Sequence, residues 1–224
     1  MRRSYLPLPT RAVPKSSAAL ARLVRRDIGP GRVADAFGEV DRAGFVPPGT
    51  VDVYGDRPVP IPEGQTTSQP SLIARMIEAL DLRPGDRVLE VGTGFGYQTA
   101  LLAKLCEEVV SIERWESLAE EARRNLAAAG IQNTHVFVGD GWKGCPERAP
   151  FDGIVVAAAA TEVPDAYVRQ LVDGGRLVIP VKRRGSDEVT LYVKRGGELE
   201  AVRLIAPARF VPLVKEDRWP DDPY

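Results

Sequence analysis

The stretch RVLEVGTGFGYQTA at residues 87–100 decides the fold class of this chain. Its first five residues are mostly apolar, as expected of a strand buried inside a parallel sheet. Gly92, Gly94 and Gly96 follow with GxGxG spacing. Glycines permit a tight turn and let a ligand lie against the backbone amides of the helix that comes next. The stretch therefore predicts a strand, a ligand-binding turn and a helix.

The charge beside this turn indicates the kind of ligand. Glu90 precedes the glycines, and Thr93 lies between the first two of them. The spacing differs from the GxGxxG fingerprint of dinucleotide-binding proteins, and a pyrophosphate would be repelled by the carboxylate of Glu90. A cationic sulfonium ligand that carries an ammonium group would be accommodated instead.

The chain on either side of this stretch alternates between short apolar segments and helical ones. Strands are predicted at residues 87–91, 109–112, 135–138, 154–156 and 176–180, and helices at residues 97–105, 115–129 and 164–172. This alternation is typical of an α/β fold with a doubly wound parallel sheet covered on both faces. Ligands of such sheets bind outside the carboxyl ends of the strands, near the point where the strand order reverses.

The segments outside this core have their own patterns. Helical spacing of Leu20, Leu23, Val24 and Ile28 predicts an N-terminal helix. The remaining expectations are a loose arm at 1–17, a second short helix at 33–40, an extended run at 54–62, a helix from Pro70 to about 80, and edge strands at 189–193 and 209–213, whose order the sequence does not give.

Composition excludes several classes of protein. Thirty basic and thirty-one acidic residues give a net charge of −1, which argues against a nucleic-acid partner. Cys106 and Cys145 are isolated, so we expect a reducing compartment, no disulfide framework and no metal site. No apolar run is long enough to cross a bilayer, and the basic N-terminus lacks the apolar stretch of a signal peptide. We therefore expect a cytoplasmic protein without a membrane partner.

Acidic residues close successive predicted strands. Glu113 ends the second strand, where a carboxylate can accept hydrogen bonds from both hydroxyls of a ribose, and Asp140 and Gly141 follow the third strand. Taken alone, Glu113 is equally compatible with a helix-capping acid, and the Asp140–Gly141 pair with a turn. Together with Glu90 and the GxGxG turn, they resemble the motifs of the class I methyltransferases. That resemblance implies a Rossmann-like fold, S-adenosylmethionine as cofactor, and an adenine site near Asp140 and Gly141.

A more specific resemblance precedes the sheet. The segment PIPEGQTTSQP at residues 60–70 is similar to the GQTxSxP signature of the protein-L-isoaspartate O-methyltransferases. The likeness extends from about residue 21 to about residue 213. It includes, in order, the stretch from 32–33 through 45–47, the approach at Tyr54, Asp56 and Pro58, and the strings at residues 139–141, 149–152, 162–164, 174–180 and 209–213.

This resemblance implies methylation of the free α-carboxylate of L-isoaspartyl residues in damaged proteins, followed by closure of the ester to a succinimide. It places Ser68 at the active site and Gln65 and Thr66 along the channel between acceptor and cofactor. A carboxylate has a reference pKa of about 4, so the nucleophile needs no general base. The work is alignment and removal of water, and a hydroxyl such as Ser68 can hold one carboxylate oxygen. The other interpretation of Ser68 is an N-cap of the helix at Pro70.

The resemblance also suggests the layout of the chain. We expect one domain with the arm at 1–17, N-terminal helices and an acceptor-channel loop at 18–69, a cofactor-binding core at 70–181, and C-terminal strands and tail at 182–224. Family habit suggests a monomer. The departure that bears on the acceptor is Pro62-Glu63, which replaces a small or aromatic pair and brings a negative charge towards the channel.

Other functions remain open at this point. A related enzyme methylating an aspartyl side chain of a dedicated natural-product peptide would share the chemistry. A nucleic-acid methyltransferase is disfavoured by the charge balance and by the lack of an Asn-Pro-Pro-aromatic motif. A nucleotide-binding or NAD-dependent module is disfavoured by Glu90 and the GxGxG spacing. A pseudoenzyme that binds cofactor without turnover fits the same residues.

Three further side chains have a structural and a functional interpretation. His135, the only histidine, falls in a predicted buried strand, so we expect a structural role. No serine lies in a GxSxG elbow, which argues against a Ser-His-Asp hydrolase. Trp115 and Trp142 follow the second and third strands and pack either on the cofactor or between helices.

Overall fold

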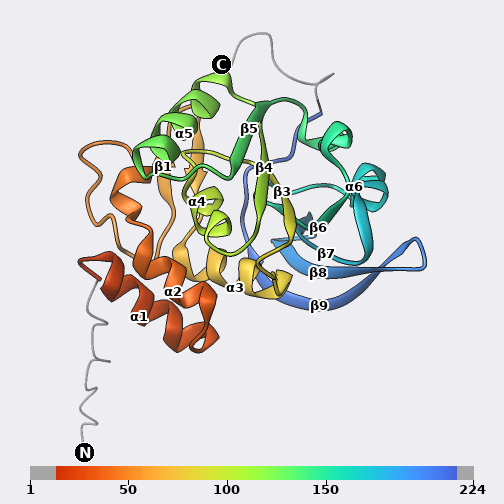
Figure 1. Cartoon of the computed structure of the whole chain (residues 1–224), viewed down its shortest axis with the longest axis horizontal. Helices are drawn as coiled ribbons and strands as arrows, with labels where there is room; N and C mark the ends of the chain where they lie inside the picture. Colours follow the sequence, from red (N-terminus) through yellow and green to blue (C-terminus); the bar gives the residue numbers. More distant parts are fainter. Residues whose placement is uncertain (1–13, 216–224) are drawn as a thin grey trace, which may run out of the picture.

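The sheet that the glycine-turn stretch predicts forms the centre of the molecule. The computed structural model describes residues 14–215 (Figure 1). Within them, the main strands are β3 (Arg87–Val91), β4 (Glu108–Glu113), β5 (Thr134–Val138), β6 (Phe151–Val156), β7 (Leu171–Lys182), β8 (Asp187–Arg195) and β9 (Glu198–Ala208). They lie in the order β5-β4-β3-β6-β7-β8-β9. The first five are parallel and the last two antiparallel, so the doubly wound fold with added edge strands is confirmed.

Helices cover both faces of this sheet. They are α1 (Ser17–Ile28), α2 (Arg32–Glu39), α3 (Pro70–Leu80), α4 (Tyr97–Ala103), α5 (Glu116–Ala128) and α6 (Asp165–Gln170), with 3-10 turns η1 (Arg42–Phe45), η2 (Gly141–Lys143) and η3 (Pro146–Arg148). Side chains alternate along each strand, so Val88 packs in the core beneath α1 to α5, whereas Leu89 packs in the core beneath α6. In Figure 1, α1–α3 and α6 accordingly flank the sheet from opposite sides.

The N-terminal helices follow the predicted pattern. α1 buries Leu20 and Val24, and Gly29, with a φ of 89°, ends it. The expected extended run at 54–62 is only partly present. Residues 51–57 form turns, held by the hydrogen bond from Gly55 N to Asp52 O (3.0 Å), and only β1 (Val59–Ile61) is extended. β1 pairs with β2 (Gln65–Thr67) in a hairpin separate from the main sheet.

The prediction of a strand at 209–213 is wrong. The outer strand is β9, which precedes that segment and follows β8 through a tight turn at Gly196 and Gly197, both with positive φ. β9 was missed because, as an edge strand, it exposes most of its residues and has little apolar patterning. Residues 209–213 leave the sheet and make an isolated bridge between Pro212 and Ala159. The predicted helix at 164–172 is also too long, because β7 begins at Leu171.

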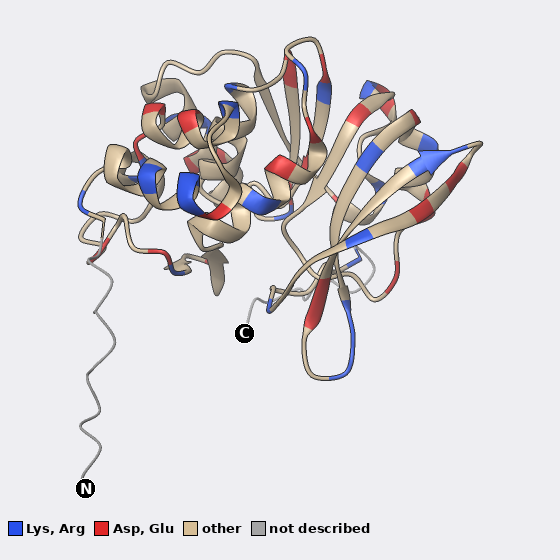
Figure 2. Ribbon diagram, turned by 90° about the horizontal axis from the view of Figure 1, so that it is seen from below, with Lys and Arg blue, Asp and Glu red and all other residues tan. Residues whose placement is uncertain are grey.

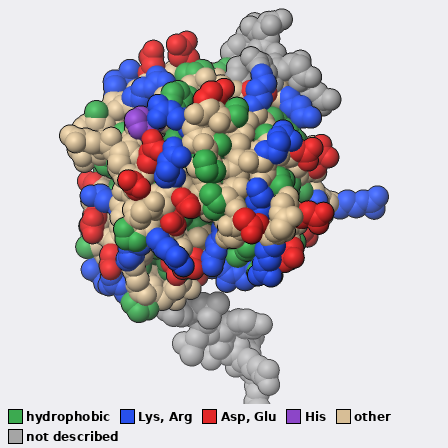
Figure 3. Space-filling view, turned by 45° about the vertical axis from the view of Figure 1, so that its right-hand side comes forward, with side chains coloured by type: hydrophobic (Ala, Val, Ile, Leu, Met, Phe, Trp, Pro, Cys, Tyr) green, Lys and Arg blue, Asp and Glu red, His purple; other side chains and the backbone are tan. Residues whose placement is uncertain are grey.

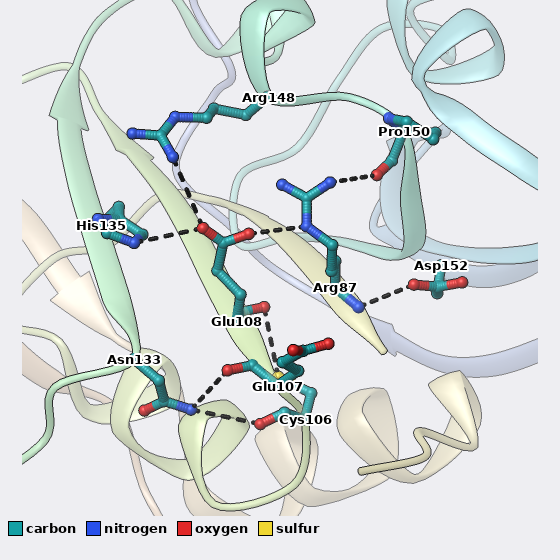
Figure 4. A network of polar contacts seen from close by, with 9 residues as sticks. All are labelled: Arg87, Cys106, Glu107, Glu108, Asn133, His135, Arg148, Pro150 and Asp152. Carbon is teal, nitrogen blue, oxygen red and sulfur yellow. Dashed lines mark hydrogen bonds and ion pairs between the residues drawn. The ribbon is translucent and has the colours of Figure 1, made fainter. Parts of the chain in front are cut away.

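The prediction that His135 lies in a buried strand is wrong. β5 is the other outer strand, and the His135 side chain is 44% exposed. The histidine, purple in Figure 3, is visible at the surface. Its Nε2 lies 3.3 Å from Glu108 Oε1, and the same carboxylate contacts Arg87 Nε at 2.7 Å and Arg148 Nη1 at 3.7 Å (Figure 4). This network ties the strands together at their amino ends, so the structural role expected of His135 fits its position.

Basic and acidic residues are interspersed along the helices and the strands of the sheet (Figure 2). Within residues 14–215, no helix combines the length and apolar character needed to span a membrane. The same part of the chain brings no three His, Cys, Asp or Glu side chains together in a group that could hold a metal ion. The first 13 residues of the expected arm lie outside the described residues, and the division of the chain at 18–69, 70–181 and 182–224 remains a prediction.

Candidate functional site

A cavity lies at the carboxyl ends of β3, β4 and β6, where the strand order reverses. One side, the sheet wall, consists of segments that follow these strands and β5; its lining residues are 91–95, 97–98, 112–115, 118, 139, 141 and 157–158. The other side, the loop wall, consists of Ile61, residues 65–68, Ile73 and residues 211–214. The position at the switch point matches the expectation from the sequence.

The glycine turn forms the floor of the sheet wall. Gly92 and Gly94 line the cavity with φ values of 96° and 55°, a region that favours glycine. A Cβ at Gly92 would lie 3.3 Å from the Ala157 side chain, so the backbones approach closely here. Thr93 also lines the cavity, and its Oγ1 lies 2.6 Å from Ser111 Oγ. Gly96 stands behind the turn as the N-cap of α4 and does not line the cavity.

Glu113 is the carboxylate that faces the cavity. It is almost buried, and it accepts backbone hydrogen bonds from Gly94 N (2.8 Å), Arg114 N (2.8 Å) and Trp115 N (3.1 Å). Burial raises the pKa of Glu113, while the three amide donors lower it. These bonds fix the orientation of the carboxylate and tie the glycine turn to the end of β4.

Glu90 has a different position from the one its sequence suggests. It is completely buried beneath the turn and does not line the cavity. Its carboxylate accepts hydrogen bonds from Thr99 Oγ1 (2.5 Å), Ser111 Oγ (2.7 Å) and Gln98 Nε2 (3.1 Å). Burial raises the pKa of Glu90 to about 7. Its contact with the cavity is therefore indirect, through the turn and through Gln98, which does line the cavity.

Asp140 and Gly141, which follow β5, lie in different pockets. Gly141 lines the cavity, and a Cβ there would lie 2.6 Å from Val91 Cγ1, so only glycine keeps this floor open. Asp140 caps η2 by accepting from Trp142 N (2.9 Å) and lines an adjacent pocket. Tyr167 donates to Gly141 O (2.8 Å) and holds the turn from below.

The hairpin and the residues after it carry the predicted acceptor channel. Gln65, Thr66 and Ser68 all line the cavity. Ser68 does not cap α3, so that interpretation is wrong: the N-cap position is Gln69, and Ser71 N is bound instead by Asp56 Oδ1 at 2.8 Å. Ser68 therefore lines the cavity without capping the helix.

A buried arginine supports this loop wall from behind. Arg42 is fully buried and donates to the carbonyl oxygens of Val53 (3.0 Å), Gly55 (2.7 Å) and Arg57 (3.1 Å), and to Thr67 Oγ1 (3.3 Å). Its guanidinium also lies 5.7 Å from the centroid of the Tyr97 ring. One side chain thus joins the 53–57 turns, the hairpin and the start of α4.

Residues 211–214 complete the loop wall, and the candidate residues chosen from sequence did not include them. Ala159 N donates to Val211 O (2.8 Å), and Leu213 N donates to Ala159 O (2.9 Å). Trp142 Nε1 donates to Leu213 O (3.1 Å), so Trp142 holds this segment and does not line the cavity. The signal that could have found them is the string at 209–213, which belongs to the family resemblance.

Aromatic side chains close the cavity between the two walls. Trp115 lines it and packs against Ile61, Phe95 and Leu118. Its Nε1 is buried and, within the described residues, has no hydrogen-bond partner, as is also true of the Tyr97 hydroxyl. The sequence left Trp115 between two interpretations, and its position beside Glu113 favours contact with a ligand.

The structure therefore brings together Gln65, Thr66, Ser68, Gly92, Thr93, Gly94, Glu113 and Gly141, and places Glu90, Gly96 and Asp140 just behind them. A carboxylate acceptor, backbone amides and an apolar, aromatic boundary suit a nucleoside-bearing ligand with hydroxyl groups. The hydroxyl of Ser68 suits a second, anionic molecule on the opposite side.

Comparison with known proteins finds relatives in the family that the sequence resembles. The sequence model of the family described as protein-L-isoaspartate(D-aspartate) O-methyltransferase (PCMT) matches residues 16–218. The chain is 49% identical over 195 residues to a protein-L-isoaspartate O-methyltransferase of Methanoculleus marisnigri, covering 87% of this chain and 88% of the relative. It is 52% identical over 185 residues to the protein of the same name in Anaeromyxobacter dehalogenans, covering 81% and 88%.

Solved structures show the same likeness. One protein-L-isoaspartate O-methyltransferase superposes with a TM-score of 0.81 and 32% identity over 88% of this chain and 65% of its own. A β-aspartate methyltransferase (PCMT) from Plasmodium falciparum, solved in complex with S-adenosyl-L-homocysteine, gives a TM-score of 0.79 and 27% identity over 91% of this chain and 100% of its own.

Proposed function

This chain belongs to the protein-L-isoaspartate(D-aspartate) O-methyltransferase family, and from that premise we propose how its cavity works. The enzyme uses S-adenosylmethionine to methylate L-isoaspartyl residues of damaged proteins at the free α-carboxylate. The ester closes to a succinimide, which starts repair. The observation that carries the proposal is the placement of the GQTTS segment directly across one cavity from the glycine turn and Glu113.

The sheet wall fits the methyl donor. Glu113 accepts the ribose hydroxyls, and the backbone of Gly92, Thr93 and Gly94 lies against the amino-acid portion of the ligand. Gly141 leaves space for the adenine, and Glu90 supports the turn from beneath by accepting hydrogen bonds from Gln98 and Thr99. Gly96 and Asp140 do not line the cavity; they act by shaping the glycine turn and η2. S-adenosylmethionine supplies an electrophilic methyl group to the acceptor carboxylate.

The loop wall fits the acceptor. The acceptor carboxylate is ionised at neutral pH, so the chain has to orient it and exclude water. Ser68 donates its hydroxyl to one carboxylate oxygen and leaves the other free to attack. Gln65 and Thr66 line the passage between the two ligands. A neutral donor suits this task, because a buried cation would bind the unreacted carboxylate too tightly.

We also propose a monomer that works in the cytoplasm on protein or peptide substrates. Cys106 and Cys145 are free and buried, which is compatible with a reducing compartment.

The test uses two peptides that differ only in an aspartyl or an isoaspartyl linkage. With labelled S-adenosylmethionine, base-labile methyl ester should form on the isoaspartyl peptide alone. Ser68→Ala should lower kcat/KM for this peptide by about 10- to 100-fold, because a hydrogen bond to a charged group is lost. It should leave the affinity for S-adenosylhomocysteine unchanged, and Ser186→Ala, in the turn between β7 and β8, serves as the matched control. Labelling of the aspartyl peptide, or binding of the cofactor without labelling of either peptide, would reject the repair assignment and favour an enzyme with a dedicated peptide acceptor.

A further inference from the structure

A second groove opens from the cavity on the side of the loop wall. Four residues line both spaces: Thr66, Ser68, Ala157 and Val211. The groove continues away from the methyl-donor side, between α3 and the end of β9. A polypeptide whose acceptor carboxylate lies at Ser68 has this groove as a path for its neighbouring residues.

The two arginines that line this groove differ in whether they have an acidic partner. Arg75 is paired, because its Nε and Nη2 donate to the two carboxylate oxygens of Asp27, both at 2.6 Å. Arg209 is exposed, and its side chain forms no hydrogen bond or ion pair with any residue of 14–215. No Asp or Glu among the described residues lines the groove. The carboxylate of Asp187, at the start of β8, accepts a hydrogen bond from Phe210 N (2.8 Å) and forms no ion pair with Arg209. Arg209 is thus the lining cation whose charge is available to a ligand.

We propose that this groove holds the substrate residues beside the isoaspartyl residue, and that Arg209 makes the enzyme prefer an acidic side chain there. The inference rests on the proposed function, because it assumes that the acceptor lies at Ser68. An exposed arginine and a carboxylate on a bound peptide form a solvent-screened ion pair, so the preference is moderate. Because contact with Arg209 is made before and during methyl transfer, it should appear mainly in KM.

The experiment scans charge along isoaspartyl peptides. Glu, Gln or Lys is placed at each of the nearest positions on either side of the isoaspartyl residue, and kcat and KM are measured with the full chain at low and high salt. For at least one position we expect a KM for the Glu peptide about 2- to 5-fold below that of the Lys peptide, shrinking at high salt. Arg209→Gln should abolish this ratio, and Arg209→Glu should invert it.

The control is Arg203→Glu. Arg203 is an exposed β9 residue that does not line the groove, so the variant changes net charge equally and should keep the wild-type ratio. Equal KM values for the Glu and Lys peptides at every position, or the same ratio in wild type and Arg209→Glu, would overturn the inference while leaving the proposed function intact. Failure of the wild type to methylate any isoaspartyl peptide would instead reject the proposed function.

Discussion

The sheet wall of the cavity is built from the ends of adjacent parallel strands, whereas the loop wall is assembled from segments outside the sheet. On the sheet wall, ladder-like backbone bonds continue past the strands, as from Gly92 N to Ile112 O and from Ala157 N to Val91 O, both at 2.8 Å. On the loop wall, the hairpin belongs to no larger sheet. Its position depends on single side chains, chiefly Arg42 and Glu63.

This difference suits the two ligands of the proposed reaction. A methyl donor has one structure, so a wall fixed by the backbone can be complementary to it in advance. Damaged proteins present isoaspartyl residues in many surroundings, and a wall of loops held by a few contacts can adapt to them. Changes in the sheet wall should therefore affect donor binding and stability, and changes in the loop wall should have smaller effects.

The largest effect expected concerns Glu90, a carboxyl buried beneath the sheet wall. Burial raises its pKa from 4.5 to about 7 in the folded chain. The folded state therefore holds a proton more tightly than the unfolded state does, and the free energy of unfolding falls as pH rises from about 4.5 to 7. One pKa unit corresponds to about 1.4 kcal/mol, so this carboxyl lowers the free energy of unfolding above pH 7 by at most about 3.5 kcal/mol.

Urea unfolding of the wild type and of Glu90→Gln at several pH values measures this contribution. Between pH 4.5 and 7, the free energy of unfolding of the variant should rise relative to that of the wild type. Above pH 7 the difference between the two should stay constant. Glu116→Gln, on the exposed side of α5, is the control. If the difference in free energy of unfolding is constant from pH 4.5 to 8, the three donors keep Glu90 ionised. Burial of Glu90 then does not destabilise the sheet wall.

The next effect concerns the carboxylate that faces the donor. Glu113→Ala removes the acceptor of three backbone amides as well as the proposed ribose contact. Because charge-assisted bonds are lost and amides are left unpaired, the affinity for S-adenosylhomocysteine should fall by about 100-fold or more. Calorimetry on the folded variant checks this, with Glu116→Ala as the matched control. An unchanged affinity would break the distinction between the walls, since the donor would then be held elsewhere.

The two walls also differ in how far the sequence predicts them. The sheet wall could be inferred from its pattern because parallel strands bring their carboxyl ends to one edge, so Gly92, Glu113 and Gly141 had to lie close together. The sequence did not separate the roles of Glu90 and Glu113, since both carboxylates lie at or one residue before the end of an apolar strand. Glu90 pairs with Ser111, and Glu113 lies two residues beyond Ser111, so both side chains leave the same face of the sheet. Glu113 lines the cavity because it lies beyond the end of β3, whereas Glu90 lies one residue before that end and is buried beneath the turn.

The sequence predicted only part of the loop wall. Ser68 came from the family resemblance, but residues 209–213, most of the segment that completes this wall, were expected to be a strand. Its backbone is held by Ala159 and by the Trp142 side chain, contacts that join distant parts of the chain and leave no periodic pattern. Arg42 is similar, because a fully buried arginine in a polar string cannot be told from an exposed one without the turn that it holds.

The smallest effect concerns the contact that fastens the hairpin over the cavity. Ser117 Oγ donates to Glu63 Oε1 at 2.7 Å, joining the hairpin tip to the first turn of α5. Glu63 occupies a position with a φ of 61°, and its charge is the departure from the family pattern noted in the sequence. An exposed hydrogen bond to a carboxylate contributes about 1 kcal/mol or less, so Ser117→Ala should speed release of S-adenosylhomocysteine by about 2- to 5-fold.

Glu63→Gln keeps an oxygen that can accept from Ser117 and should change the release rate less than Ser117→Ala does. Stopped-flow fluorescence can follow release, because Trp115 lies in the cavity wall. If both variants release the ligand at the wild-type rate, the hairpin is held instead by Ile61, which packs on Phe95 and Leu118. In that case Ile61→Ala should speed release where Ser117→Ala does not, and the loop wall would owe its position to apolar packing, as the sheet wall does beneath its turn.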